Sequence, residues 1–371
     1  MKKLFFIAVL AGAALVSCTK NEVAPSVQQE ITFEAPIVGN ATKVDLITTY
    51  PTTSTFGVYA LYYAADWTGY DDGSAYMSNV QVTHEAPAGG DAEGGWVANG
   101  YYWPKQTDAT LTFAAYSPYM SSGVSHDEKG ISFTNYVVGA DADVDLLFSE
   151  RTYNQKPANQ IVNNNSTYYG VNINFNHALS AIVFQAKAAD GLTGNTAPNP
   201  NYEFKITKIE VLGVKNKGSF SQGITDSASD PTTPPASTTD WKIAGDAVDT
   251  DYTAYIGSGI NVNNSTTPNS AYGTDHAGKA DLILIPQSLA SVKVRVTYDM
   301  RHSNMPEDTW VQGNVSEANL SYDDAVDSKD VTSWLRGKRY VYTLTLGLNE
   351  IYFAPSISNW DPVTVAGSQV L

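Results

Sequence analysis

Cysteine is nearly absent from this chain, which holds one, Cys18, among 371 residues. A single thiol forms no intramolecular disulfide and no thiolate metal cluster, so packing must stabilise the fold. Basic residues are also scarce, because 22 Lys and Arg stand against 38 Asp and Glu and give a formal charge of −16 at pH 7. A chain this acidic repels phosphate backbones, and we expect no nucleic-acid partner.

Sequence signatures of catalysis are missing as well. The chain has no G-x-S-x-G elbow, no phosphate-binding G-x-x-x-x-G-K-[ST] loop, no H-E-x-x-H and no dinucleotide fingerprint. Asp141, Asp143 and Asp145 alternate as in the opening of a calcium loop, but Leu146 stands where an EF-hand needs glycine. We therefore expect no enzyme, no cofactor and no metal. A glycosidase stays open on motifs alone, because it needs only two carboxylates.

The N-terminal segment gives the single cysteine a role. Lys2 and Lys3 precede an apolar run that is too short to cross a bilayer comfortably, and small residues lead from it to Cys18. This order resembles the lipobox of bacterial lipoproteins, in which the cysteine is acylated and becomes the first mature residue. We expect residues 1–18 to be a lipoprotein signal peptide with its lipobox cysteine, and the polar residues 19–28 to be a tether. The alternative is ordinary secretion with a free thiol.

Composition and length favour two β-domains. The chain holds 23 Tyr, 7 Trp and 12 Phe, and its 17 Pro and 28 Gly lie between short apolar runs, as in all-β proteins. The length exceeds that of one ordinary domain. We expect an N-terminal domain over residues 29–170 and a C-terminal domain over residues 171–371.

Alternation of apolar and polar residues predicts a first strand at 29–38. Its apolar residues Ile31, Phe33, Ala35 and Ile37 are expected to share one buried face. This strand opens the N-terminal domain and directly follows the tether.

Further strands are predicted from the same alternation. The stretch 172–187 holds two strands joined by a short helical turn, which begins at His177, a residue expected to be packed and hydrogen-bonded. A phase slip within 204–214 predicts a β-bulge. Residues 281–286 and 291–298 are expected to form an antiparallel pair.

Several motifs, taken in order, resemble those of the Bacteroidales fimbrillin family, the shaft and tip subunits of type V pili. They are the lipobox cysteine and tether, ITFEAP, Tyr102-Trp103-Pro104 before LTFAAYSPY, Asp145-Leu146-Leu147, FNHALSAIVF, Leu284-Ile285-Pro286-Gln287, Trp334, Gly337-Lys338, Tyr340-Val341-Tyr342, Ile351 and Asn359-Trp360. The resemblance implies two consecutive transthyretin-like antiparallel β-sandwich domains. It also implies a lipid anchor in the outer membrane and a place in a cell-surface fimbrium that supports adhesion.

The resemblance further implies assembly with other fimbrial subunits, as a homopolymer or heteropolymer, by β-strand complementation. In family members an arginine-specific protease removes the first strand, whereas this chain has no arginine before Arg151. Lys43, in a predicted exposed loop, is the candidate processing site, unless the subunit is not trimmed. Val363, Val365 and Val370 near the C-terminus form a candidate donor strand for a neighbour. They fit equally an edge strand folded back on its own domain.

Two other functions remain in competition. The aromatic run Tyr101, Tyr102 and Trp103 would suit a monomeric outer-membrane surface lipoprotein that binds glycans, because aromatic faces stack on sugar rings. The candidate partner is a host or bacterial surface glycan or protein. The same run is also typical of a domain core. An unrecognised hydrolase is the remaining alternative.

Overall fold

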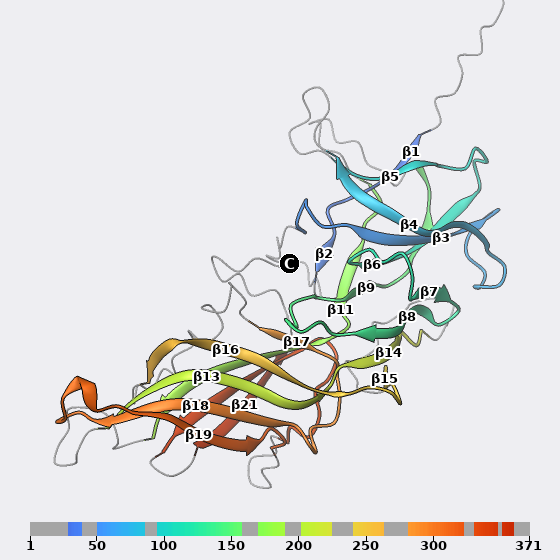
Figure 1. The fold of residues 1–371 in the computed structure, drawn as a ribbon. Helices are drawn as coiled ribbons and strands as arrows, with labels where there is room; N and C mark the ends of the chain where they lie inside the picture. Colours follow the sequence, from blue (N-terminus) through green and yellow to red (C-terminus); the bar gives the residue numbers. More distant parts are fainter. Residues whose placement is uncertain are drawn as a thin grey trace, which may run out of the picture.

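A computed structural model describes residues 29–38, 50–85, 95–157, 170–189, 202–224, 240–262, 281–322, 330–347 and 351–359. The prediction of an all-β chain is confirmed, since strands arranged in four sheets dominate these residues, and 3-10 structure such as η3 (Glu307–Thr309) is short (Figure 1). Across the same ranges, no helix has the length and apolar character needed to cross a membrane.

The first sheet has nine strands. They are β1 (Glu30–Phe33), β2 (Ile37–Val38), β3 (Phe56–Tyr63), β4 (Ser74–Glu85), β5 (Gly95–Tyr102), β6 (Thr110–Ser117), β9 (Leu147–Ser149), β10 (Thr152–Gln155) and β11 (Asn174–His177). The order is β1-β5-β4-β3-β6-β9-β11-β2, with β10 on β6. Because β1 and β2 belong to one continuous segment, the sheet closes on itself around an aromatic core.

Two four-stranded sheets pack face to face in the C-terminal part. One is β17 (Leu282–Leu284), β12 (Ser180–Ala188), β20 (Lys338–Leu346) and β21 (Ile351–Asn359). The other is β16 (Asp249–Val262), β13 (Tyr202–Lys215), β18 (Lys293–His302) and β19 (Val311–Asn319). Their inward residues, such as Phe184 and Val294, belong to one core. Most pairs are antiparallel, but β12 and β20 run parallel.

Two local expectations are wrong. The segments 281–286 and 291–298 do not pair, because β17 pairs with β12 and β18 pairs with β13 and β19. Between them Leu289 is fully buried, so this connection carries the chain from one sheet to the other instead of turning as a hairpin. Residues 178 and 179 form a bend and not a helical turn. The bulge in β13 is confirmed, with a register shift between Ile206 and Lys208.

A fourth sheet joins the two parts of the chain (Figure 1). It contains β7 (Val124–Asp127), β8 (Gly130–Val137), β14 (Lys217–Ser221) and β15 (Trp241–Ile243), in the order β15-β14-β8-β7. Strands β8 and β14 pair antiparallel although they lie on opposite sides of the expected division at residue 171. Strand β11, which follows that division, pairs within the first sheet. Independent folding of residues 171–371 stays a prediction.

Aromatic rings reinforce this junction. Phe220 of β14 lies 5.5 Å from Phe133 of β8, 5.0 Å from Phe148 of β9 and 5.5 Å from Trp241 of β15, measured between ring centroids. Phe133 and Phe148 come from the N-terminal part and Phe220 and Trp241 from the C-terminal part. The two parts therefore share a hydrophobic core as well as a sheet.

Candidate strand-insertion site

The segment 30–38 departs from its predicted one-faced pattern. Ile31 and Phe33 are buried as expected, but Ala35 is exposed and Ile37 is only half-buried. The strand is interrupted between β1 and β2, where Pro36 has no N–H for a ladder hydrogen bond, and the inward phase resumes at Val38. Thr32 is fully buried too, because this segment has strands on both of its sides.

On one side the segment pairs with β5. The register is antiparallel, with Thr32 opposite Val97 and Phe33 opposite Trp96. On this side β1 continues the ladder of β4 and β5.

On the other side the segment runs parallel to residues 171–175. Val171 donates its N–H to the Thr32 carbonyl at 2.8 Å, and its own carbonyl accepts the Glu34 N–H at 3.0 Å. Further along, the Ile37 N–H reaches the Ile173 carbonyl at 3.1 Å. The segment thus fills a slot between two strands, and its removal would leave two sheet edges unpaired.

Apolar side chains hold the segment in this slot. Phe33 makes edge-to-face contacts with Phe56 at 5.6 Å and Phe113 at 5.7 Å, and together with Ile31 and Val38 it is at most 2% exposed. Each such side chain stabilises the inserted state by about 1.5–3 kcal/mol. A strand that replaced this segment would need apolar residues at the same places.

Gly170 fits closely against the inserted strand. A Cβ atom at this position would come within 2.4 Å of the Phe33 nitrogen and the Thr32 carbonyl. These are backbone atoms, which cannot rotate away as a side chain would. The pairing at this point therefore requires glycine. The sequence pattern did not show this requirement, because nothing in the residues alone places 170 beside 32.

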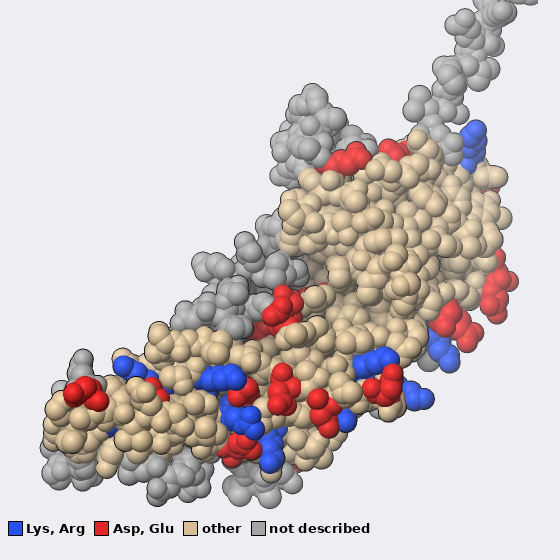
Figure 2. Space-filling model, viewed as in Figure 1, with Lys and Arg blue, Asp and Glu red and all other residues tan. Residues whose placement is uncertain are grey.

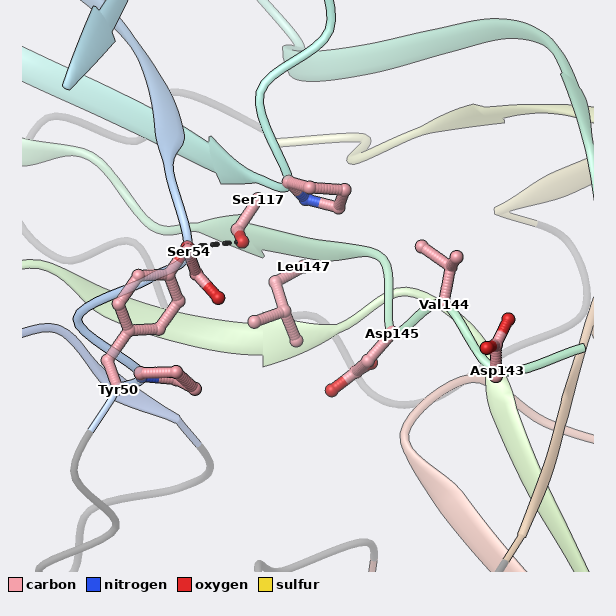
Figure 3. Close-up of a pocket in the computed structure, with 9 residues that line it drawn as sticks. Tyr50, Ser54, Ser117, Asp143, Val144, Asp145 and Leu147 are labelled. Carbon is pink, nitrogen blue, oxygen red and sulfur yellow. Dashed lines mark hydrogen bonds between the residues drawn. The ribbon is translucent and has the colours of Figure 1, made fainter. Parts of the chain in front are cut away.

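A pocket of about 290 Å³ lies in the first part of the chain (Figure 3). Tyr50, Pro51, Pro118, Val144 and Leu147 supply most of its wall, and four polar residues complete it: Ser54, Ser117, Asp143 and Asp145. The Tyr50 phenol and the Ser117 hydroxyl are hydrogen-bonded at 2.6 Å, and burial raises the pKa of Tyr50 to about 12. A serine nucleophile needs a neighbouring general base to activate its hydroxyl, whereas the hydroxyl of Ser117 is hydrogen-bonded to a phenol.

His177 is packed and hydrogen-bonded, as the sequence predicts. Its ring is 5% exposed, and its Nδ1 lies 2.9 Å from a carboxylate oxygen of Asp145. The same contact pairs Asp145, the last acidic residue of the 141–145 run, with a histidine. Within the described ranges, no three His, Cys, Asp or Glu side chains are grouped so that they could hold a metal.

Of the remaining predicted site residues, some lie outside the described residues and the others differ in their exposure to solvent. Cys18, Lys43, Val363, Val365 and Val370 lie outside the described residues, and their roles stay predictions. The aromatic run at 101–103 contains both a core residue and a surface residue, since Trp103 is 2% exposed whereas Tyr102 is 40% exposed.

Arg151 is buried at 4% exposure, with its guanidinium over the rings of Trp67 and Tyr70. It donates to the carbonyls of Asp127 at 2.6 Å and Glu128 at 2.9 Å. It therefore fastens the β7–β8 turn to the first sheet and is inaccessible to a protease in the folded chain.

Fold and site together define a class: an all-β protein in which backbone pairing and apolar packing hold one short segment between two strands of a closed sheet. The sequence profile of the fimbrillin-like family matches residues 42–360, and the chain belongs to this family. No curated protein matches the sequence closely enough to count as a relative.

The solved structures that resemble this chain include fimbrial proteins. A fimbrial protein from Bacteroides vulgatus is 17% identical, with a TM-score of 0.51, over 82% of this chain and 93% of that one. The tip fimbrial protein Mfa3 from Porphyromonas gingivalis is 9% identical, with a TM-score of 0.37, over 83% of this chain and 95% of that one. Membership of the family supports a structural role in a fimbrium at the cell surface, in association with other fimbrial subunits.

Proposed function

We propose that the chain is a structural subunit of a cell-surface fimbrium that assembles by β-strand complementation and supports adhesion. The observation behind this proposal is the segment 30–38, which is paired with strands on both sides and whose side chains Ile31, Phe33 and Val38 are buried. Its withdrawal would expose two backbone edges above an aromatic core. A strand of matching apolar pattern from another subunit would restore both.

The donor in this proposal is the C-terminal segment that contains Val363, Val365 and Val370. Its alternation supplies apolar side chains for the positions that Ile31 and Phe33 occupy in the uncut chain. Other subunits of the same fimbrium are the partners, in a homopolymer or a heteropolymer.

Export as a lipoprotein places the subunit at the outer membrane, with Cys18 as the lipid-bearing residue. Processing at Lys43 then releases the first strand together with the lipid. The burial of Arg151 supports Lys43 as the processing site. Arg151 is the first arginine in the chain, and its burial leaves an arginine-specific protease no accessible site up to that point.

The test separates strand donation from a folded-back C-terminal edge. A site for a sequence-specific protease is placed after Lys43, and the cut chain is compared with a cut chain that lacks residues 363–371. Donation requires a denaturation-resistant ladder on gels from the first and monomers from the second. The proposal is wrong if the truncated chain forms the ladder as readily. A folded-back edge would instead appear as a lower melting temperature of the uncut truncated monomer.

A glycine pair tests the slot itself. Gly170→Ala introduces a Cβ into the backbone of the inserted strand, whereas a Cβ at Gly139 would have no neighbour within 4 Å. Cut Gly170→Ala protein should form a weaker ladder than cut Gly139→Ala protein. Equal ladders would show that the donor does not occupy the path of β1.

A further inference from the structure

A cluster of tyrosines lies beside the first strand, on three strands of the first sheet. The rings of Tyr62 on β3 and Tyr76 on β4 stack with centroids 6.4 Å apart and planes inclined by 23°. The Tyr76 phenol donates a hydrogen bond to the carbonyl of Tyr102, at the end of β5. We call Tyr62, Tyr76 and Tyr102 the tyrosine cluster.

Tyr102 is the solvent-exposed residue of the cluster, and Tyr62 and Tyr76 pack against the protein. Tyr102 is 40% exposed and is the only aromatic residue among the exposed large apolar side chains of the described ranges. Tyr62 and Tyr76 are half-buried and pack against the first core. Trp103, next to Tyr102, is buried 5.9 Å from the ring of Phe113. These contacts restrain the rings of Tyr62 and Tyr76 and the backbone of Tyr102, so less conformational entropy is lost there when a ligand binds.

The strands around the cluster carry no lysine or arginine and only two carboxylates. Strands β3, β4, β5 and β6 contain one acidic residue, Glu85 at the end of β4, and no lysine or arginine. The neighbouring strand β1 adds a second carboxylate, Glu30, which lies opposite Tyr102. The exposed positions of β4 and β5 include Ser74, Ser78, Gln81 and Asn99. Figure 2 shows the same contrast, since the upper body over these strands is mostly tan whereas blue and red alternate along the lower one.

This chemistry selects a neutral ligand with both apolar and hydroxyl faces. An anionic polymer finds no lysine or arginine on these strands to pair with, and a chain of formal charge −16 repels it. A pyranose ring presents C–H groups that pack on the electron-rich face of a tyrosine. Its hydroxyls match the hydroxyl and amide side chains around the cluster, which both donate and accept hydrogen bonds.

We propose that the tyrosine cluster binds a neutral polysaccharide. Tyr102 stacks on one sugar ring, and the Tyr76 phenol, which stacks on Tyr62, positions the backbone of Tyr102 through its carbonyl. The binding rests on the proposed function only for its setting, since it would supply the adhesion of the fimbrial subunit.

The test uses the purified, uncut full chain and its migration in native gels that contain a neutral α-glucan, β-glucan, mannan or galactan. Hyaluronan serves as the acidic comparison. At least one neutral polysaccharide should retard the protein, and Tyr102→Ala should weaken this retardation about tenfold, the effect of losing one stacked ring. Tyr102→Phe keeps the ring and should retain binding. Val311→Ala, at an exposed apolar residue of β19, is the matched control.

The outcomes decide the inference separately from assembly. It is overturned if no neutral polysaccharide retards the protein, if only hyaluronan does, or if Tyr102→Ala binds as tightly as the unmodified chain. Because Tyr102 is exposed, the alanine variant should keep its melting temperature. It should also form the same ladder after cutting. Loss of sugar binding by Tyr102→Ala with an intact ladder supports the inference, because the variant is then correctly folded. Sugar binding by the unmodified chain without any ladder would refute the assembly proposal and leave the sugar-binding inference standing.

Discussion

Replacing Glu150 by glutamine should change how the stability of the chain depends on pH. Glu150 follows β9, where its Oε2 accepts a hydrogen bond from Gln222 Nε2 at 3.2 Å. Its buried Oε1 has no hydrogen-bond partner among the described residues. Burial raises the pKa of this carboxyl from 4.5 to about 7, although Arg336, Gln222 and Arg151 each act to lower it. The native state therefore keeps a proton that the unfolded chain releases.

The sign follows from this difference in proton binding. Between pH 4.5 and about 7 the native state holds more protons than the unfolded state, so the free energy of unfolding falls as pH rises. The favourable contribution is complete below this window and is lost above it. At about 1.4 kcal/mol per pKa unit, the loss is on the order of 3 kcal/mol. Glutamine carries no charge and its oxygen still accepts from Gln222, so Glu150→Gln should not show this loss.

The measurement is urea denaturation followed by tryptophan fluorescence at several pH values from about 4.5 to 8. The unmodified chain and Glu150→Gln should have similar stability at the acidic end, and the variant should be more stable at the alkaline end. Glu85→Gln removes an exposed carboxylate from the end of β4 and is the control. Parallel pH curves for the chain and Glu150→Gln, or a less stable variant near pH 8, would refute the reasoning.

Three further changes test other contacts. Phe220→Ala removes a ring from the shared core and should cost about 3–5 kcal/mol in urea denaturation, with a single transition retained. Two separate transitions in the unmodified chain would contradict a shared core. Arg151→Lys keeps the charge but loses the fork that reaches two carbonyls, so it should cost about 1–3 kcal/mol. An unchanged melting temperature would argue against that role. Cys18→Ala should abolish incorporation of radiolabelled palmitate and outer-membrane delivery, and unchanged labelling would rule out this lipid site.

Residue periodicity predicts part of the burial in this chain, although Ala35 and Ile37 depart from it. The inward positions of Ile31 and Phe33, the bulge in β13 and the packed state of His177 all follow from local pattern and composition. These features depend on the polarity of a residue and its near neighbours. They need no knowledge of the partner strand.

Pairing partners were not predictable in the same way. Ala181 of β12 lies opposite Arg339 of β20, and Phe220 of β14 lies opposite Phe133 of β8, because long connections bring these strands together. Alternation is the same whichever strand is the neighbour, which is why β17 and β18 look like a hairpin in sequence. Similarly, the glycine at 170 is explained only by the backbone of β1, which is distant in sequence.

The sheet shared by β8 and β14 has a mechanical consequence. If the two parts met only through a flexible linker, a pull on one would first reorient the other, as at a hinge. Here a pull must shear or unzip backbone hydrogen bonds and separate the rings of Phe133 and Phe220 before the parts can move apart. We therefore expect the two parts of the chain to move as one rigid unit when the chain is under tension.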